Sequence, residues 1–85
     1  MRYFIYALYS STYNKIYIGR TSNIKARLMS HYYTGTKGYT LRYRPWKLVY
    51  LERCEDLKTS MVREKQLKSA QGRAFVWNII KKSFS

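Results

Sequence analysis

The sequence predicts an α+β domain with a three-stranded, mostly antiparallel sheet flanked by helices, in the order β-β-α-β-α-α. Two segments that alternate apolar and other side chains, residues 3–9 and 13–19, flank a short polar stretch and indicate a hairpin. A third such segment spans residues 47–53. Apolar residues recur at helical spacing between and after these segments. Because 85 residues suffice for one core, we expect a single domain over residues 1–85.

The hairpin is expected to bring two tyrosines together. A tight turn would place Tyr6 opposite Tyr17 and Tyr9 opposite Asn14. Opposed residues share one face of a sheet, and a slip of two residues in the register keeps them on that face. Tyrosine is common on half-buried strands, so the pair is either ordinary sheet packing or a functional pair of hydroxyls.

The first helix follows the hairpin and is capped by Thr21, Ser22 or Asn23. Its apolar residues recur at every fourth position: Ile24, Leu28 and Tyr32. Residues 34–46 contain two glycines and a proline and are expected to form a loop before the third strand.

Two more helices are expected after the third strand. Asp56 can cap the second helix, which runs to about Ser69. Gly72 is expected to interrupt the helical pattern. The third helix then has an apolar face made of four residues: Phe75, Val76, Ile79 and Ile80.

The charge of the chain points to a polyanionic partner. Seventeen Lys and Arg residues face four acids, which gives a net charge of +13. All ten tyrosines lie in the first fifty residues, and the four acids lie between Glu52 and Glu64. A basic, tyrosine-rich surface favours nucleic acid over a membrane, for which no long basic amphipathic segment is present. With Cys54 as the one cysteine and no signal-peptide pattern, we expect a cytoplasmic protein.

One acid occupies a costly position. On the second helix, Leu57, Met61 and Leu67 define an apolar stripe, and Glu64 lies inside it. A carboxylate facing a core is destabilising unless it is paired or bound to a cation. Glu64 is therefore either the partner of a nearby arginine or a metal ligand or catalytic acid or base.

If a basic protein of this kind cleaves phosphodiester bonds, its few histidine, cysteine and acidic residues exclude most known catalytic designs. Arg27 and His31 are four residues apart, so they share one face of the first helix and fit a phosphate. One histidine cannot supply a two-histidine acid–base pair, and with one cysteine it cannot build a structural zinc site. What remains is one metal on one carboxylate, a cationic phosphate clamp, and a tyrosine base whose pKa nearby cations lower.

These residues together resemble the GIY-YIG nuclease family. Its two hairpin tripeptides correspond to Phe4-Ile5-Tyr6, in which Phe4 replaces the first glycine, and to Tyr17-Ile18-Gly19. The segment GRTSNIKARLMSH resembles the family pattern G-x-T-x-(D/N)-x-x-x-R-x-x-x-H. RPWKLVYLE and REKQLK resemble the small single-domain bacterial branch, which is related to the UvrC N-terminal nuclease domain. The resemblance covers residues 3 to about 73 and implies the GIY-YIG nuclease fold.

The resemblance also implies catalytic roles. Tyr6 would be the general base or would partner the attacking water, and Tyr17 would support it. Arg27 would stabilise the transition state, and His31 would contact the phosphate or help to move a proton. Glu64 would hold one divalent ion, Mg²⁺ or Mn²⁺. Two further positions have weaker expectations: Asn78 matches a supporting asparagine of the family poorly, and Gly19 is expected to allow either close packing or a positive φ.

A second set of residues is expected to contact nucleic acid. In the loop, cationic side chains interleave with aromatic ones, as in surfaces that track a backbone and stack on bases. The alternative is a solvated loop with Trp46 packed beneath it. The expected nucleic-acid-binding residues are Arg20, Lys37, Tyr39, Arg42, Arg44, Trp46, Lys65 and Lys68.

The resulting hypothesis is a metal-dependent DNA endonuclease, structure-selective and of the kind used in DNA repair or recombination. Its alternative is a non-catalytic nucleic-acid-binding module on the GIY-YIG scaffold. DNA is the expected partner, RNA stays an alternative, and no membrane is expected. A monomer or weak dimer is expected, with specificity supplied by DNA structure or a protein partner.

Overall fold

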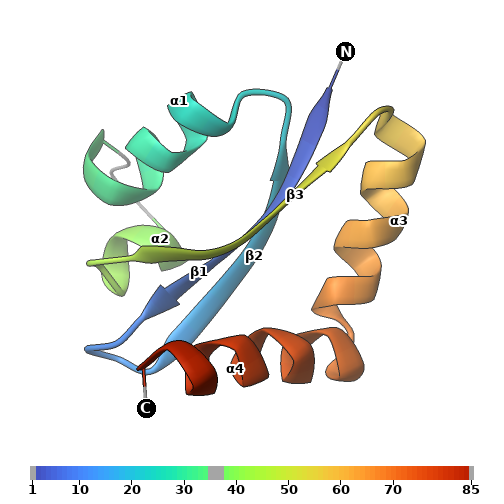
Figure 1. The fold of residues 1–85 in the computed structure, drawn as a ribbon. Helices are drawn as coiled ribbons and strands as arrows, with labels where there is room; N and C mark the ends of the chain where they lie inside the picture. The colour runs from blue at the N-terminus through green and yellow to red at the C-terminus, as the bar shows by residue number, and fades with distance from the viewer. Residues whose placement is uncertain (1, 35–37, 85) are drawn as a thin grey trace.

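The computed structural model describes residues 2–34 and 38–84, and its fold is the predicted α+β arrangement (Figure 1). The sheet has the strand order β2-β1-β3, and both pairs are antiparallel. Its strands are β1 (Tyr3–Ser10), β2 (Lys15–Thr21) and β3 (Lys47–Cys54). The helical elements are α1 (Ile24–Met29), the π-helical turn η1 (Ser30–Thr34), α2 (Tyr39–Arg42), α3 (Leu57–Lys68) and α4 (Ala70–Phe84). The short helix α2 lies where the sequence predicted only a loop.

The register of the hairpin differs from the expected one by two residues. Tyr6 lies opposite Gly19, and Tyr17 lies opposite Leu8, so the expected direct pairing of the two tyrosines is wrong. The turn is longer than expected because it spans residues 11–14, and Asn14 closes it with a left-handed φ of 55°. Asparagine tolerates this conformation better than most residues do. Since side chains alternate along a strand, a slip of two leaves Tyr6 and Tyr17 on the same face.

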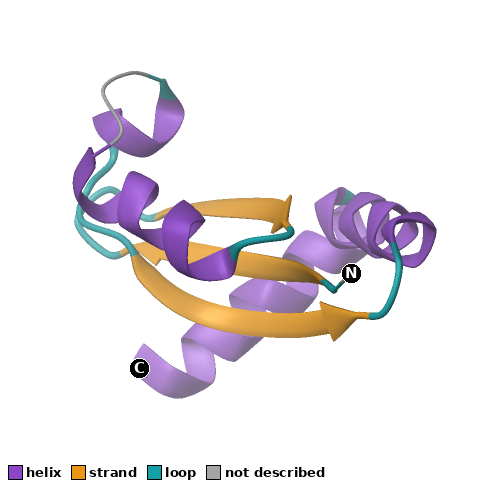
Figure 2. Cartoon of the chain, turned by 90° about the horizontal axis from the view of Figure 1, so that it is seen from above, coloured by secondary structure: helices purple, strands orange, loops and turns teal. Residues whose placement is uncertain are grey.

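Helices cover both faces of the sheet. Figure 2 shows α1 over one face and α4 behind the other. Under α1, the buried Tyr6, Leu8 and Trp46 pack with Ile24 and Leu28. The core on the opposite face is larger and consists of Ile5, Ala7, Ile16, Ile18, Cys54, Leu67, Val76 and Ile80. Each large apolar side chain buried in this way stabilises the fold by about 1.5–3 kcal/mol.

Side-chain caps begin two of the helices. Asn23, one of three expected caps, accepts a hydrogen bond from the Ala26 backbone N–H at 3.1 Å. The Asp56 carboxylate accepts one from the Thr59 N–H at 2.7 Å, as the sequence predicted for the next long helix. The expected interruption at Gly72 is wrong, because α3 ends before Ser69 and α4 begins at the following residue. In the described residues, no helix combines the length and apolarity that crossing a bilayer needs.

The inner face of α3 is more polar than expected. Ser60 and Leu67 are buried, whereas Leu57 and Met61 are 43% and 52% exposed, so the expected apolar stripe is wrong at those two positions. Polar residues can face the sheet here because they are paired with opposite charges or hydrogen-bonded. One such pair joins α3 to β3, where Arg63 Nε lies 2.8 Å from Oε2 of Glu52.

Candidate active site

Three aromatic rings meet between the sheet and η1. The ring centroids of Tyr6 and Tyr17 are 6.2 Å apart, and those of Tyr17 and His31 are 4.9 Å apart. Gly19 makes room for this group, since a Cβ there would lie 2.5 Å from the Tyr6 hydroxyl oxygen. Of the two roles expected for Gly19, close packing is the observed one. Gly38 is the one glycine with a positive φ in the part of the chain that is described.

A buried hydrogen bond joins two of these rings. The Tyr6 hydroxyl lies 2.7 Å from Nε2 of His31, and the two residues are 1% and 5% exposed. The π-helical turn η1 carries His31 inward, whereas Arg27 stays exposed at the end of α1. Nδ1 of His31 is buried and has no hydrogen-bond partner among the described residues. The imidazole is therefore held by Tyr6 on one side and has an unused nitrogen on the other.

Burial decides the protonation states of the pair. It raises the pKa of the Tyr6 phenol well above its usual range, and Tyr17 adds to this effect, which outweighs the opposite influence of Arg27. We expected cations to lower the pKa of a tyrosine base here, and for Tyr6 this expectation is wrong. Burial also lowers the pKa of His31, assisted by Arg27 and Arg44, so the imidazole is neutral near pH 7. The structure thus holds a neutral phenol beside a neutral imidazole.

Glu64 lies half-buried on the inner side of α3 and is paired with two cations. Its Oε1 accepts a hydrogen bond from Arg20 Nε at 3.2 Å, and its Oε2 lies 3.0 Å from Lys68 Nζ. Burial raises the pKa of the carboxyl, but the hydrogen bonds from Lys68 and Arg20 outweigh it, so the pKa lies below its usual value. Glu64 also adds to the raised pKa of Tyr6, which places its charge within electrostatic reach of that phenol.

Glu64 is the carboxylate that would hold a single divalent ion. No cluster of three or more His, Cys, Asp or Glu side chains that would hold a metal occurs within residues 2–34 and 38–84. Mg²⁺ needs no such cluster, because it is commonly bound by one or two carboxylates together with water and substrate phosphates. Glu64 is ionised and only partly enclosed, with a side chain that is 21% exposed. An incoming ion would have to compete with Arg20 and Lys68 for the carboxylate.

The other residues expected to bind nucleic acid differ in how far they are buried. Arg42 and Lys65 are exposed, and Tyr39 is 42% exposed. Trp46 is 6% exposed and donates its indole N–H to the Thr40 carbonyl at 2.7 Å, so it supports the surface from beneath. Lys37 lies outside the described residues.

Arg44, another expected nucleic-acid contact, is engaged inside the molecule. Its Nε donates to the His31 carbonyl at 2.7 Å, and its Nη2 donates to the Ser30 carbonyl at 2.8 Å. These carbonyls belong to the π-helical turn, so Arg44 holds the segment that presents His31. Sequence reasoning missed this role, because nothing in the sequence indicates a π-helical turn whose carbonyls need an arginine.

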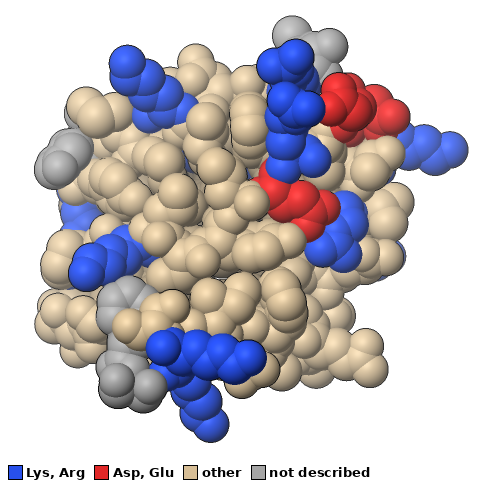
Figure 3. Space-filling view, viewed as in Figure 1, with Lys and Arg blue, Asp and Glu red and all other residues tan. Residues whose placement is uncertain are grey.

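The charge distribution separates two regions of the surface. On the face shown in Figure 3, acidic side chains gather on the side where α3 lies. Lysine and arginine side chains appear around the rim, and in this view the described part of α1 and α2 carries no acid. The side of the molecule on which α1 and α2 lie is therefore the more suitable one for a phosphate backbone.

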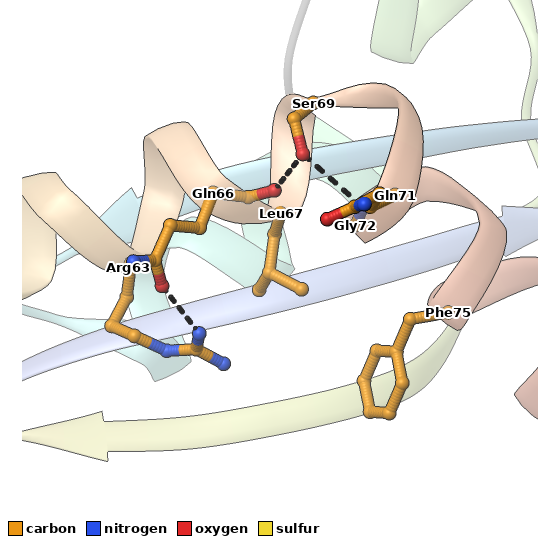
Figure 4. A pocket seen from close by; sticks show the side chains of 7 residues that line it. All are labelled: Arg63, Gln66, Leu67, Ser69, Gln71, Gly72 and Phe75. Atoms are coloured by element: carbon orange, nitrogen blue, oxygen red, sulfur yellow. Dashed lines mark hydrogen bonds between the residues drawn. The ribbon is translucent and has the colours of Figure 1, made fainter.

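A cavity elsewhere in the fold contains none of the expected site residues. It has a volume of about 410 Å³ and lies at the junction of α3 and α4 (Figure 4). The junction is tight, because a Cβ on Gly72 would lie 2.2 Å from the Gln66 carbonyl oxygen. Ser69 closes it by donating to that carbonyl and accepting from the Gly72 N–H. Asn78 is exposed and lines another cavity on α4 that likewise includes none of the expected site residues.

A cleft that does include an expected catalytic residue lies along β2. Its volume is about 360 Å³, and it is lined by Ile16, Tyr17, Ile18, Tyr39, Lys68 and Arg73. Sequence reasoning missed Arg73. The sequence predicted the end of α3 at about Ser69, but the expected interruption at Gly72 left Arg73 unassigned, whereas the structure places Arg73 in the first turns of α4.

The comparisons with known proteins agree with this geometry. The family model described as the GIY-YIG catalytic domain matches residues 2–78, which is nearly the whole chain. No curated protein and no solved structure matches the chain. The match places the hairpin, η1, all of α3 and more than half of α4 inside the family domain. The chain therefore belongs to the GIY-YIG catalytic domain family, a family of nucleases that act on nucleic acid.

Proposed function

We propose that this protein is a divalent-metal-dependent endonuclease that hydrolyses phosphodiester bonds in DNA. The observation that carries the proposal is the 2.7 Å hydrogen bond between the Tyr6 hydroxyl and His31 Nε2, beside Tyr17 and Arg27. A neutral imidazole held against a phenol is a proton acceptor, and an arginine nearby suits a phosphate. Structure-selective cleavage in DNA repair or recombination is the role that we expect for it.

Tyr6 acts through His31 in this proposal. Because the pKa of the phenol is raised, an ionised tyrosinate is too rare to serve as the base. As the attacking water gives a proton to the phenol oxygen, the phenol passes its own proton to Nε2 of His31. The net change is one proton moved from water to the imidazole. Arg27 and Arg44 disfavour the imidazolium that forms, and negative charge that develops on the phosphate would offset their effect.

Arg27, Tyr17 and Glu64 complete the site. Arg27 is exposed at the end of α1, where its guanidinium can bind the scissile phosphate and stabilise the charge that gathers on it. Tyr17 is half-buried and lies between His31 and the solvent-facing cleft along β2. Glu64 would hold one Mg²⁺ or Mn²⁺, which when bound supplies a positive charge that shields the phosphate and the leaving oxygen.

A second function is favoured by one observation. Both oxygens of Glu64 are already bonded to cations, an arrangement that would be stable without metal. The same basic scaffold would then serve as a non-catalytic nucleic-acid-binding module. The two functions differ in whether any metal supports cleavage.

Supercoiled plasmid incubated with the protein and Mg²⁺, Mn²⁺ or EDTA distinguishes them. The nuclease proposal predicts metal-dependent nicking that is lost in Glu64→Ala while DNA binding persists. The matched control is Glu55→Ala, which removes a 73% exposed carboxylate paired with Arg53 and should nick normally. Equal nicking by wild type and Glu64→Ala would contradict the site. Binding without nicking under every metal would favour the binding module.

A further inference from the structure

The cleft along β2 adjoins the candidate site and differs from it in chemistry. It shares Tyr17 with the three-ring group and extends along the outer edge of β2 to the junction of α3 and α4. Two isoleucines, two tyrosines and two cations line it. Figure 2 shows α2, which carries Tyr39, outside the edge of the sheet that β2 forms.

Tyr39 is a fixed and accessible ring in this cleft. Its hydroxyl donates a hydrogen bond to the Ile16 carbonyl at 3.1 Å, and its ring stacks on Trp46 with a centroid distance of 5.8 Å. The residue as a whole nevertheless remains 42% exposed. A ring held from two sides loses little conformational entropy when a second aromatic group stacks on it. The hydroxyl also occupies the β2 edge at Ile16, which hinders addition of a peptide strand there.

Two cations supply charge complementary to a phosphate. Arg73 lies close enough to act on Tyr39: burial and Tyr43 raise the pKa of the phenol, and the guanidinium of Arg73 opposes them. Lys68 is the second cation, and it links the cleft to Glu64 through their 3.0 Å ion pair. A phosphate at these cations and a base on Tyr39 would belong to a nucleotide near the candidate site.

We infer that this cleft binds one unpaired nucleotide of the DNA next to the scissile phosphate, so that the preferred substrate carries a single-stranded segment there. Bases inside a duplex already stack on each other and pair, so a protein ring can stack only on a base that is unpaired or displaced. The inference rests on the proposed nuclease function, whose substrate class it names. Tyr39 provides the stacking platform, and Arg73 with Lys68 binds the phosphate.

Binding measured in EDTA tests the inference without cleavage. Fluorescence anisotropy compares a labelled single-stranded oligonucleotide with its duplex, using Tyr39→Leu and the matched control Phe75→Leu, which removes a 47% exposed ring on α4. Tyr39→Leu should weaken single-strand binding about tenfold and change duplex binding less than twofold. Tyr39→Phe keeps the ring, so its affinity for the single strand should stay near that of the wild type. This variant controls for misfolding. Phe75→Leu should leave both affinities unchanged.

The cation is tested by a second matched pair on the same helix. Arg73→Ala should weaken single-strand binding more than Lys81→Ala, although each removes one positive charge from α4. Equal losses for the two variants, or equal effects of Tyr39→Leu on single strand and duplex, would overturn the inference. Plasmid nicking without any dependence on Tyr39 would overturn it while keeping the nuclease function. Selective single-strand binding by a protein that never cleaves would instead support the cleft and refute the nuclease.

Discussion

The hydroxyl of Tyr6 lies 2.7 Å from Nε2 of His31, in the buried layer between the sheet and η1. The bond joins residues 25 positions apart, one on β1 and one in a π-helical turn. Burial keeps the phenol protonated and the imidazole neutral. In the proposed mechanism the imidazole accepts the proton that the phenol gives up, so we expect the two side chains to act as one unit.

The stability of the fold should depend on the protonation of His31. Because its pKa is lower in the folded chain than in the unfolded chain, the unfolded state binds the proton more readily. The stability that the neutral imidazole contributes is present above about pH 6.5. It is lost as the pH falls from there through the pKa of His31 in the folded chain, by at most about 1.4 kcal/mol per pH unit. Urea unfolding between pH 7.5 and 5 measures it.

The variant His31→Gln is the control for this pH dependence. The sequence contains one histidine, and the carboxyl groups with lowered pKa affect stability only near the acid end of this window, where they begin to bind protons in the unfolded chain. The slope between pH 7.5 and about 6 should therefore disappear in His31→Gln. An equal slope in both proteins would show that another group is responsible.

Gly19→Ala should displace the ring of Tyr6. The new Cβ would lie 2.5 Å from the hydroxyl oxygen and 2.6 Å from Cζ, too close for either atom to stay in place. We expect a loss of about 1–3 kcal/mol in stability and a large loss of activity. In the Tyr6→Ala background the same substitution should cost much less, and a double-mutant cycle by urea unfolding measures the difference. Additive costs would contradict the contact.

Arg44→Lys should separate a structural role from a DNA contact. The lysine keeps the charge but lacks the planar guanidinium, whose Nε and Nη2 donate in a fixed geometry to the His31 and Ser30 carbonyls. Stability should fall by about 1–3 kcal/mol, and the affinity for nonspecific DNA should change little. A variant of normal stability that loses DNA affinity would reverse this assignment.

Metal affinity should be set by competition at Glu64. Lys68→Met removes the cation at Oε2, so Mn²⁺ should bind more tightly than to wild type. Glu64→Gln should bind Mn²⁺ more weakly, whereas Glu55→Gln on the exposed surface should match wild type. Electron paramagnetic resonance of free Mn²⁺ during a titration gives the Mn²⁺ affinities of the wild type and of the three variants. Unchanged binding in Glu64→Gln would rule out this carboxylate as the ligand.

Local patterns in the sequence predicted most of the fold. Alternation predicted the three strands, and Asp56 predicted the start of α3 because its carboxylate caps the Thr59 N–H. The shared face of Tyr6 and Tyr17 was also predictable, because alternation tolerates a slip of two residues. The family match was predictable from the tripeptides and the spacing of Arg27 and His31.

The remaining features depend on contacts between distant segments. On α3, Leu57 and Met61 are exposed instead of buried, and Arg63 forms an ion pair with Glu52 of β3, a contact between elements that the apolar pattern does not report. The π-helical turn depends on Arg44, and the raised pKa of Tyr6 depends on burial that no local pattern reports. The cleft that contains Arg73 is lined by residues of β2, α2, α3 and α4, which no local pattern brings together.

Single-turnover cleavage by Tyr6→Phe, compared with Tyr9→Phe, tests the central claim most directly. Both variants lose one hydroxyl from β1, and that of Tyr9 donates to Asn14 Oδ1 in the hairpin at 3.5 Å. The proton path from water through Tyr6 to His31 predicts a rate loss of about 10²-fold or more in Tyr6→Phe, with DNA binding near wild type. Stability should fall by about 1–3 kcal/mol, because Nε2 of His31 loses its buried partner, so the rates are compared at a temperature where both variants are folded. Tyr9→Phe should cleave normally. Equal rates for the two variants would contradict the claim that the Tyr6–His31 pair performs the proton transfer.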